Sequence, residues 1–298
     1  MQAGQMRSIF ANPHFLLIIY TLIVSLSFHV GHAITNDIHP VLLTFVRFAL
    51  GALVFSTFVF RQYGFKRPSV KDISRYTLIS LTLVGYFLAM FYALRYTSAV
   101  NASLIFVTVP IFTTIAGMVL LRQYPPLYKV VILLLTMLGA VWVIADGDAV
   151  NLIGLKLNVG DIIFLFGCMG IGLYPVFTKL FAKKEPTAVL TFWTLLTGSI
   201  VLACFANVEI FKMDWLAAPA RLYYGLGFIV LLSTVVTFFI IQYSSRKIPV
   251  SQVTAYTYLI PVFVMAEEIL LTGTFPAWSV WPGVAAVAAG TFLFMKNG

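Results

Sequence analysis

The sequence predicts an all-α integral membrane protein in which ten transmembrane helices form two inverted five-helix repeats around a central cavity. Three observations lead to this prediction: a very apolar composition, ten apolar runs of membrane-spanning length, and a pattern that recurs after 147 to 151 positions. The recurrence divides the chain into residues 1–147 and 148–298, and we expect each part to hold five helices.

The composition is that of a chain embedded in lipid. Apolar residues make up 61% of the 298 residues and charged residues 10%, whereas soluble domains are about 45–50% apolar and about 25% charged. The net charge of +9 fits basic loops beside a membrane and does not require nucleic acid. Cys168 and Cys204 lie inside apolar runs, without the spacing of a metal site or a disulfide framework. We therefore expect a lipid bilayer as partner, and no nucleic acid, metal or other cofactor.

Ten runs are long enough, or nearly so, to cross a hydrocarbon core that needs about 20 apolar residues per helix. They are Phe15–Ile34, Val41–Phe60, Tyr76–Leu94, Val100–Leu120, Tyr128–Ala145, Val159–Phe181, Ala188–Ala206, Leu222–Ile241, Val253–Leu271 and Ala277–Met295. The first run is too long for a signal peptide, and no small-residue cleavage site follows it.

Basic residues predict the orientation of these helices. One set of helix ends carries thirteen Lys and Arg residues, and the opposite set carries four. Because cytoplasmic loops are enriched in Lys and Arg, this asymmetry predicts an inner-membrane protein with both termini in the cytoplasm.

The repeat is clearest where Tyr92–Pro110 recurs as Tyr243–Pro261, at a shift of 151 positions. Upstream, Leu43–Phe45 recurs as Leu190–Phe192 at a shift of 147. Because each copy holds an odd number of helices, the second copy must enter the membrane upside down. Inverted repeats of this kind are a transporter architecture that binds substrate between the halves near the bilayer midplane.

The sixth run ends in Leu173–Lys179, and the fourth and ninth runs carry a proline at matching places, Pro110 and Pro261. With the two repeats, these features resemble the drug/metabolite transporter superfamily, and within it the EamA-type exporters, which include bacterial amino-acid exporters. The resemblance implies ten helices, a central cavity and the export of small metabolites.

The resemblance also assigns individual positions. Lys179 matches the family's first-helix Lys, for which the first copy has His32, and Arg47 matches the Arg of the second helix. Gln123 and Thr274 stand where the family often has Glu, so a role borrowed for that position does not transfer.

Polar residues that fall on one helical face are the candidates for lining the cavity, because polar groups in the bilayer core are costly unless they face the bundle interior or water. The candidates are Ser25, His29, His32, Tyr86, Tyr92, Asn101, Tyr174, Lys179, Ser233, Thr237, Gln252, Tyr256 and Glu267. Pro110, Pro175 and Pro261 are candidate gating positions, because proline kinks a helix and frees backbone carbonyls.

Several of these residues have more than one interpretation. His29 and His32 could pack with hydrogen bonds, line the cavity, sense protons or, least favoured, bind a metal. Glu267 could form a structural ion pair with Arg47, couple transport to protons or bind a substrate amine. Lys179 could extend to the membrane surface or bind a substrate carboxylate.

We expect a secondary transporter that exports small amphipathic metabolites, amino acids including aromatic ones above all, by alternating access. No nucleotide-binding motif is present in the sequence, so the chain itself would not use ATP. Proton-coupled efflux of cationic drugs is the alternative within the same class. An integral membrane enzyme built on His29, His32 and Glu267 and a structural scaffold are the alternatives from other classes.

Overall fold

The computed structural model describes residues 12–64, 67–97, 102, 105–145, 147–153, 158–273 and 275–296, and within these residues it contains helices and no strand. The α-helices of the first half are α2 (Pro13–Ile34), α3 (Pro40–Tyr63), α4 (Val70–Ala93), α6 (Val109–Leu121) and α7 (Leu127–Ile144), and the short α8 (Ala149–Ile153) opens the second half. The others of the second half are α9 (Val159–Phe181), α10 (Thr187–Lys212), α11 (Ala220–Val230), α12 (Thr237–Ser245), α13 (Val250–Ala255), α14 (Ile260–Thr272) and α15 (Trp281–Lys296).

Six helical segments of the described residues are long and apolar enough to cross a membrane: Pro13–Ile34, Pro40–Tyr63, Val70–Ala93, Val159–Phe181, Thr187–Ala206 and Ala220–Ser245. Shorter apolar helices cover Val109–Leu121, Leu127–Val143 and Trp278–Leu293. Where the structure describes them, the predicted apolar runs are largely helical, which is consistent with a multi-pass membrane protein. The inverted relation of the two halves stays a prediction.

Local sequence explains several helix starts. Ser69 and Asp72 form a reciprocal capping box at the start of α4, and Asn158 and Asp161 form another at the start of α9. Each box pairs backbone N–H groups that would otherwise lack a partner in the first turn.

The fourth and ninth apolar runs are not continuous α-helices, contrary to the sequence-based prediction. The fourth run contains a turn at Val107–Thr108 before α6, and the ninth contains a 3₁₀ turn, η2 (Tyr256–Leu259), between α13 and α14. Pro110 and Pro261 then occupy the first turn of α6 and α14, where the missing N–H would have no helical partner anyway. Each irregular turn directly precedes its proline, as expected of a residue that disrupts helical hydrogen bonding, and a gating role for the two prolines stays a prediction.

The eighth run is also irregular. Its α-helical ends, α11 and α12, are joined by a π-helical turn, η1 (Leu231–Val236). Within it, the Thr234 hydroxyl donates a hydrogen bond of 2.8 Å to the carbonyl of Ile229, five residues earlier. Such wide turns are rare and occur frequently at functional sites.

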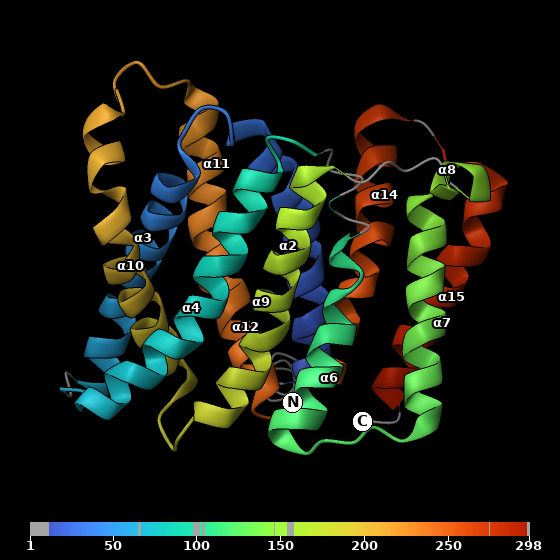
Figure 1. The fold of residues 1–298 in the computed structure, drawn as a ribbon, viewed down its shortest axis with the longest axis horizontal. Coiled ribbons are helices and arrows are strands. Elements are labelled where there is room, and N and C mark those ends of the chain that lie inside the picture. Colours follow the sequence, from blue (N-terminus) through green and yellow to red (C-terminus); the bar gives the residue numbers. More distant parts are fainter. Residues whose placement is uncertain are drawn as a thin grey trace, which may run out of the picture.

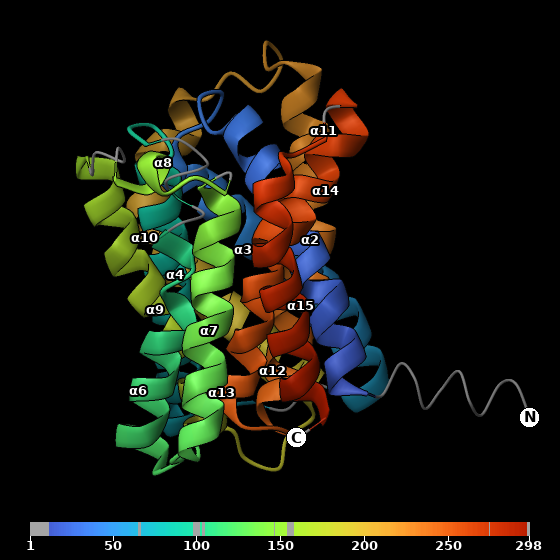
Figure 2. The ribbon, with the colours of Figure 1, turned by 90° about the vertical axis from the view of Figure 1, so that its right-hand side faces the viewer.

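The helices stand side by side as a bundle, and α2 begins at the same end of the bundle at which α15 ends (Figure 1). Helices α2, α3, α4, α9, α10 and α12 contribute to one large apolar core. A smaller second core joins α7 and α15 to the η2 region, and these two helices run together along one side of the molecule (Figures 1 and 2).

Helices α7 and α15 approach closely because glycines face each other. A Cβ atom built on Gly283 would lie 2.7 Å from the carbonyl oxygen of Gly139, and one built on Gly139 would lie 3.0 Å from that of Gly283. Both positions therefore require glycine for packing, although neither backbone adopts a positive φ.

We expect Gly283→Ala to lower the stability of the folded chain by about 1–3 kcal/mol, the usual cost of forcing extra volume into a packed contact. Thermal unfolding of the purified protein in detergent measures the change. Gly85→Ala is the matched control, because a Cβ atom at Gly85 meets nothing within 4 Å. Equal unfolding temperatures for the two variants would contradict this account of the α7–α15 contact.

At the end of the bundle opposite to the start of α2, an ion pair joins the turn between α2 and α3 to the first turn of α11. Both Asp37 carboxylate oxygens accept hydrogen bonds from Arg221, at 2.7 and 2.8 Å. The hydrogen bond from the Arg221 guanidinium holds the pKa of the Asp37 carboxyl below its usual value. A carboxylate with a lowered folded-state pKa contributes stability above its unfolded pKa and loses that contribution as the pH falls through the folded value.

We expect Asp37→Asn to lower the unfolding temperature slightly at pH 7. The difference from the unchanged chain should shrink as the pH falls below about 3.9, the ordinary Asp pKa, and should vanish once the pH lies below the lowered pKa of the folded state. Arg221→Gln should cause the same loss, and the double variant should lose no more than either single one. A difference that stays constant from pH 7 into this acid range would show that the Asp37 charge is not its source.

Candidate functional site

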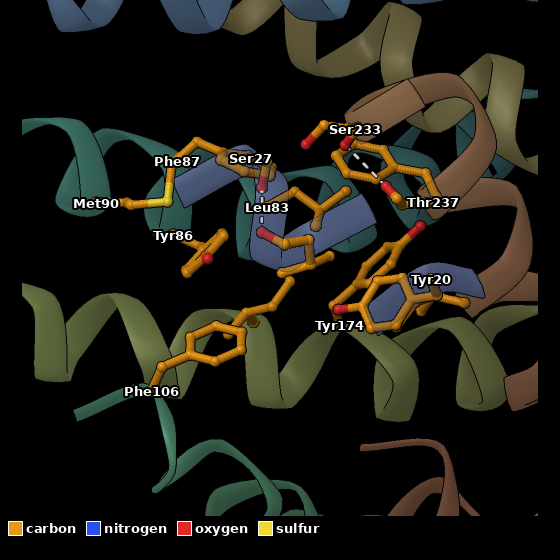
Figure 3. Close-up of a pocket in the computed structure, with 14 residues that line it drawn as sticks. Tyr20, Ser27, Leu83, Tyr86, Phe87, Met90, Phe106, Tyr174, Ser233 and Thr237 are labelled. Carbon is orange, nitrogen blue, oxygen red and sulfur yellow. Dashed lines mark hydrogen bonds between the residues drawn. The ribbon is translucent and has the colours of Figure 1, made fainter. Parts of the chain in front are cut away.

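A small cavity of about 30 Å³ lies among α2, α4, α9, η1 and α12 (Figure 3). The side chains around it leave a narrow slot. A cavity at the centre of a helical bundle is the position at which transporters of repeated helices hold their substrates.

Aromatic rings form most of the wall. Tyr20 comes from α2, Tyr86 from α4 and Tyr174 from α9, and all three side chains are buried. Phe106, from the segment before α6, packs with its ring centroid 6.0 Å from that of Tyr86. Figure 3 shows these rings around the same space. The wall can therefore hold an apolar or aromatic group by ring contact.

Three hydroxyl groups complete the wall. The Ser27 hydroxyl donates to the carbonyl of Val24 at 2.7 Å, and the Thr237 hydroxyl donates to the carbonyl of Ser233 at 2.8 Å (Figure 3). The Ser233 hydroxyl is the third. Because the protons of Ser27 and Thr237 are engaged with their own helices, the lone pairs of both oxygens remain able to accept hydrogen bonds from a ligand.

Arg47 lies directly behind this wall, with a residue exposure of 1%. Its guanidinium carbon sits 3.6 Å from the ring centroid of Phe87, which lines the cavity. Its Nε donates to the Thr234 hydroxyl at 2.9 Å, and its Nη2 donates to the carbonyl of Ser233, also at 2.9 Å. The π-helical turn η1 thus supplies the oxygen atoms that hold this buried cation.

The structure does not form the predicted ion pair between Arg47 and Glu267. Among the described residues, no carboxylate lies within 4.0 Å of Arg47. The physical reason is that neutral oxygens of η1 and the face of Phe87 take up the charge instead. The pairing was predicted because Arg47 and Glu267 lie at similar depths in the membrane, but depth does not show which helices are neighbours.

Glu267 lies in a separate cluster, where α14 packs against α2. The Ser25 hydroxyl donates to Glu267 Oε1 at 2.5 Å, and His29 Nδ1 lies 3.3 Å from Glu267 Oε2. The contact with His29 has an ion-pair distance but not the geometry of a hydrogen bond. The Glu267 side chain is nearly buried, whereas that of His29 is 39% exposed. This arrangement can exchange a proton between a buried carboxylate and a more accessible imidazole.

Four of the predicted cavity residues line the cavity together: Tyr86, Tyr174, Ser233 and Thr237. Two others, Ser25 and His29, join Glu267 in the cluster on α2 and α14. His32 is exposed on the surface of the bundle and joins neither group. Asn101 lies outside the described residues.

The remaining predicted residues are dispersed. The Tyr256 hydroxyl lies 2.7 Å from His14 Nδ1, and Tyr92 lies at hydrogen-bond distance from a second histidine, His39. Lys179 donates to the carbonyl of Ile248 at 3.2 Å.

Gln252 is buried in α13, and neither polar atom of its side chain has a hydrogen-bond partner in the structure. Pro175 lies inside α9, which continues to Phe181. Neither residue lines the cavity.

Sequence reasoning missed several residues of the wall. Tyr20, Val24 and Ser27 share one face of α2, at positions i, i+4 and i+7, and that spacing could have identified them. Phe87, Phe106 and Phe238 carry no polar signal, because an aromatic ring that faces a cavity cannot be distinguished by sequence from one in a core.

Within the described residues, no group of three or more His, Cys, Asp and Glu side chains is placed to hold a metal ion.

Comparison with known proteins identifies the family. The EamA-like transporter family matches this chain twice, over residues 12–145 and 158–296. The chain belongs to the EamA-like transporter family. This membership confirms the resemblance stated from the sequence, and it indicates a membrane transporter rather than an enzyme.

Proteins with similar sequences are named as transporters without a stated substrate. An uncharacterized transporter of Archaeoglobus fulgidus is 25% identical over 290 residues, which cover 95% of this chain and 97% of that protein. The uncharacterized transporter YyaM of Bacillus subtilis is 22% identical over 256 residues, covering 85% and 84% of the two chains. A solved structure described as a crystal structure of protein shares the fold of this EamA-like chain, with a TM-score of 0.73, 17% identity and 96% coverage of each chain.

Proposed function

We propose that this EamA-like transporter exports small amphipathic metabolites that carry a carboxylate, amino acids with aromatic or other bulky side chains above all, across the inner membrane. Transport would be secondary and would follow alternating access around the cavity between α2, α4, α9 and α12. The observation that carries the proposal is the pairing of an aromatic, hydroxyl-bearing cavity with a buried, unpaired arginine behind its wall.

Different parts of the cavity wall would bind the side chain and the ammonium group of an amino acid. The rings of Tyr20, Tyr86 and Phe106 would contact an apolar side chain, and the oxygens of Ser27 and Thr237 could accept hydrogen bonds from an ammonium group.

Arg47 would supply the interaction for the carboxylate. A cation buried in a membrane bundle is costly, and in such a position it is by default a functional group with a partner. Nε and Nη2 are bonded to η1, whereas Nη1 donates to none of the described residues. Phe87 separates the guanidinium from the cavity, so a rotation of that ring would let a carboxylate approach.

Several observations support the division into repeats over 1–147 and 148–298. The family matches each part separately. Helices α6 and α14 both have 13 residues and a proline in the first turn, and each is followed by a C-cap residue in the left-handed region, Arg122 (φ 54°) and Gly273 (φ 72°). Each pair of features is offset by 151 positions. We infer that the repeats are inverted and that the broken helices before Pro110 and Pro261 act as opposing hinges, with Pro175 of α9 as a third gating position.

The start of α2 and the end of α15 lie at one end of the bundle (Figure 1), as an even number of crossings requires. Because basic residues gather at that end of the chain's helices, we propose that both termini are cytoplasmic.

Replacing Arg47 with Leu should reduce the flux of phenylalanine into or out of liposomes by at least about tenfold, because a hydrogen bond to a charged group contributes about 1.5–3 kcal/mol. Phenethylamine, which lacks the carboxylate, should cross equally through the unchanged chain and the variant. This split between two substrates separates a substrate-binding role from a structural one.

Arg47→Lys serves as the control, because it keeps the charge and should retain part of the phenylalanine flux. A similar loss for phenylalanine and phenethylamine, or no loss for either, would rule out Arg47 as the carboxylate partner. The unfolding temperature of each variant must be measured alongside the flux, since Arg47 also holds η1.

The cluster of Ser25, His29 and Glu267 favours a second candidate function, the proton-coupled efflux of cationic drugs. A nearly buried carboxylate beside a partly exposed histidine is the kind of group that carries protons in secondary transporters.

Under this second function, Glu267→Gln should abolish the acceleration of ethidium efflux by an imposed pH gradient, while leaving gradient-independent flux unchanged. Ser25→Ala is the matched control, because it removes a hydrogen bond to the carboxylate and leaves the charge. Gradient-driven efflux that survives in Glu267→Gln would exclude the proton route.

A further inference from the structure

A second and larger hollow lies at the end of the bundle where α3 ends and α4 and α10 begin, at the lower left of Figure 1. It contains about 1130 Å³ of unfilled space, part of which opens to the outside. Its lining residues are entirely different from those of the central cavity.

The lining carries an excess of positive charge. Arg67, Arg75, Lys183 and Lys184 contribute four cations, and Asp72 and Glu185 contribute two carboxylates, so the net charge of the lining is +2.

The carboxylates are already engaged. Arg75 bonds to Asp72 at 3.1 Å and to Glu185 at 2.6 Å, and Lys183 bonds to Asp72 at 2.6 Å. Arg67 and Lys184 have no counter-ion within the part of the chain that the structure describes. Both side chains belong to exposed residues, and both line the same hollow. They are therefore free to bind an anion.

The hollow is also lined by aromatic side chains. Tyr76 and Trp193 stack with their ring centroids 6.1 Å apart and an interplanar angle of 11°. Phe60 and Tyr63, near the end of α3, also line the hollow, with residue exposures of 40% and 37%. Exposed aromatic side chains at a helix end are typical of the level of the lipid headgroups.

We propose that this hollow binds the phosphate of an anionic phospholipid, with Arg67 and Lys184 as the phosphate ligands and the aromatic side of α3 and α10 against the upper acyl chains. Two features favour a lipid over a soluble phosphate. The cations lie where the helices end, at headgroup depth, and the lining of the hollow includes apolar side chains of α3 that are exposed at the surface, such as Phe60, which is 40% exposed. Basic pockets between transmembrane helices are known to bind anionic headgroups. The proposal does not depend on what the central cavity transports.

The test is native mass spectrometry of the full chain in detergent, titrated with dioleoylphosphatidylglycerol or with dioleoylphosphatidylcholine. The unchanged chain should retain phosphatidylglycerol in preference to phosphatidylcholine. In Arg67→Gln/Lys184→Gln, its affinity for phosphatidylglycerol should fall about 25-fold, since each basic residue near an anionic headgroup contributes a factor of about five.

Lys71→Gln/Arg122→Gln is the matched control, because it removes two exposed charges that do not line the hollow. It should keep the full affinity, and both double variants should unfold at the temperature of the unchanged chain when no lipid is added. An equal loss in the control, or equal retention of the two lipids, would overturn the proposal. Displacement of phosphatidylglycerol by millimolar inorganic phosphate would instead assign the site to a soluble phosphate, and would equally overturn it.

Discussion

The structure depends on one constraint: within lipid, each backbone polar group must find its partner inside the protein. Regular helices meet this constraint by themselves, so every irregular turn must be covered by neighbouring groups. The π-helical turn η1 shows the consequence most clearly, because Arg47 of α3 bonds to the carbonyl of Ser233 and to the Thr234 hydroxyl. The cation and the irregular turn compensate each other, and neither could be placed there alone at low cost.

This mutual compensation ties the wall of the cavity to a neighbouring helix. Ser233 and Phe87 both contact Arg47 and both line the cavity. Any movement of α12 relative to α3 must therefore change the environment of the cation, and any anion that binds near the cation must compete with η1 for it. Charge and cavity shape are thus coupled by the same few contacts.

Composition and apolar periodicity were sufficient to predict an all-α membrane protein and the position of nearly every helix, because membrane thickness sets helix length. They failed at Val107–Thr108 and at Tyr256–Leu259, where a proline beyond the break begins a new helix and gives no sign of where the old one stops. The site was harder to predict. Tyr86, Tyr174, Ser233 and Thr237 were found because polar groups on a helical face signal the interior, whereas Phe87 and Phe106 gave no such signal. Partners could not be predicted at all: Glu267 meets Ser25 rather than Arg47, since helix neighbours depend on packing that no single run of sequence encodes.

The reciprocal contact between Gly139 and Gly283 also affects how the protein is made. Trp281, where α15 begins, follows the last residue of α7, Ile144, by 137 positions. At a synthesis rate of about 5–20 residues per second, α7 must wait on the order of ten seconds for its partner to emerge from the ribosome. The α7–α15 pair therefore cannot form until nearly the whole chain has been synthesised, and a chain that terminates before Trp281 leaves the glycine-bearing face of α7 without this partner.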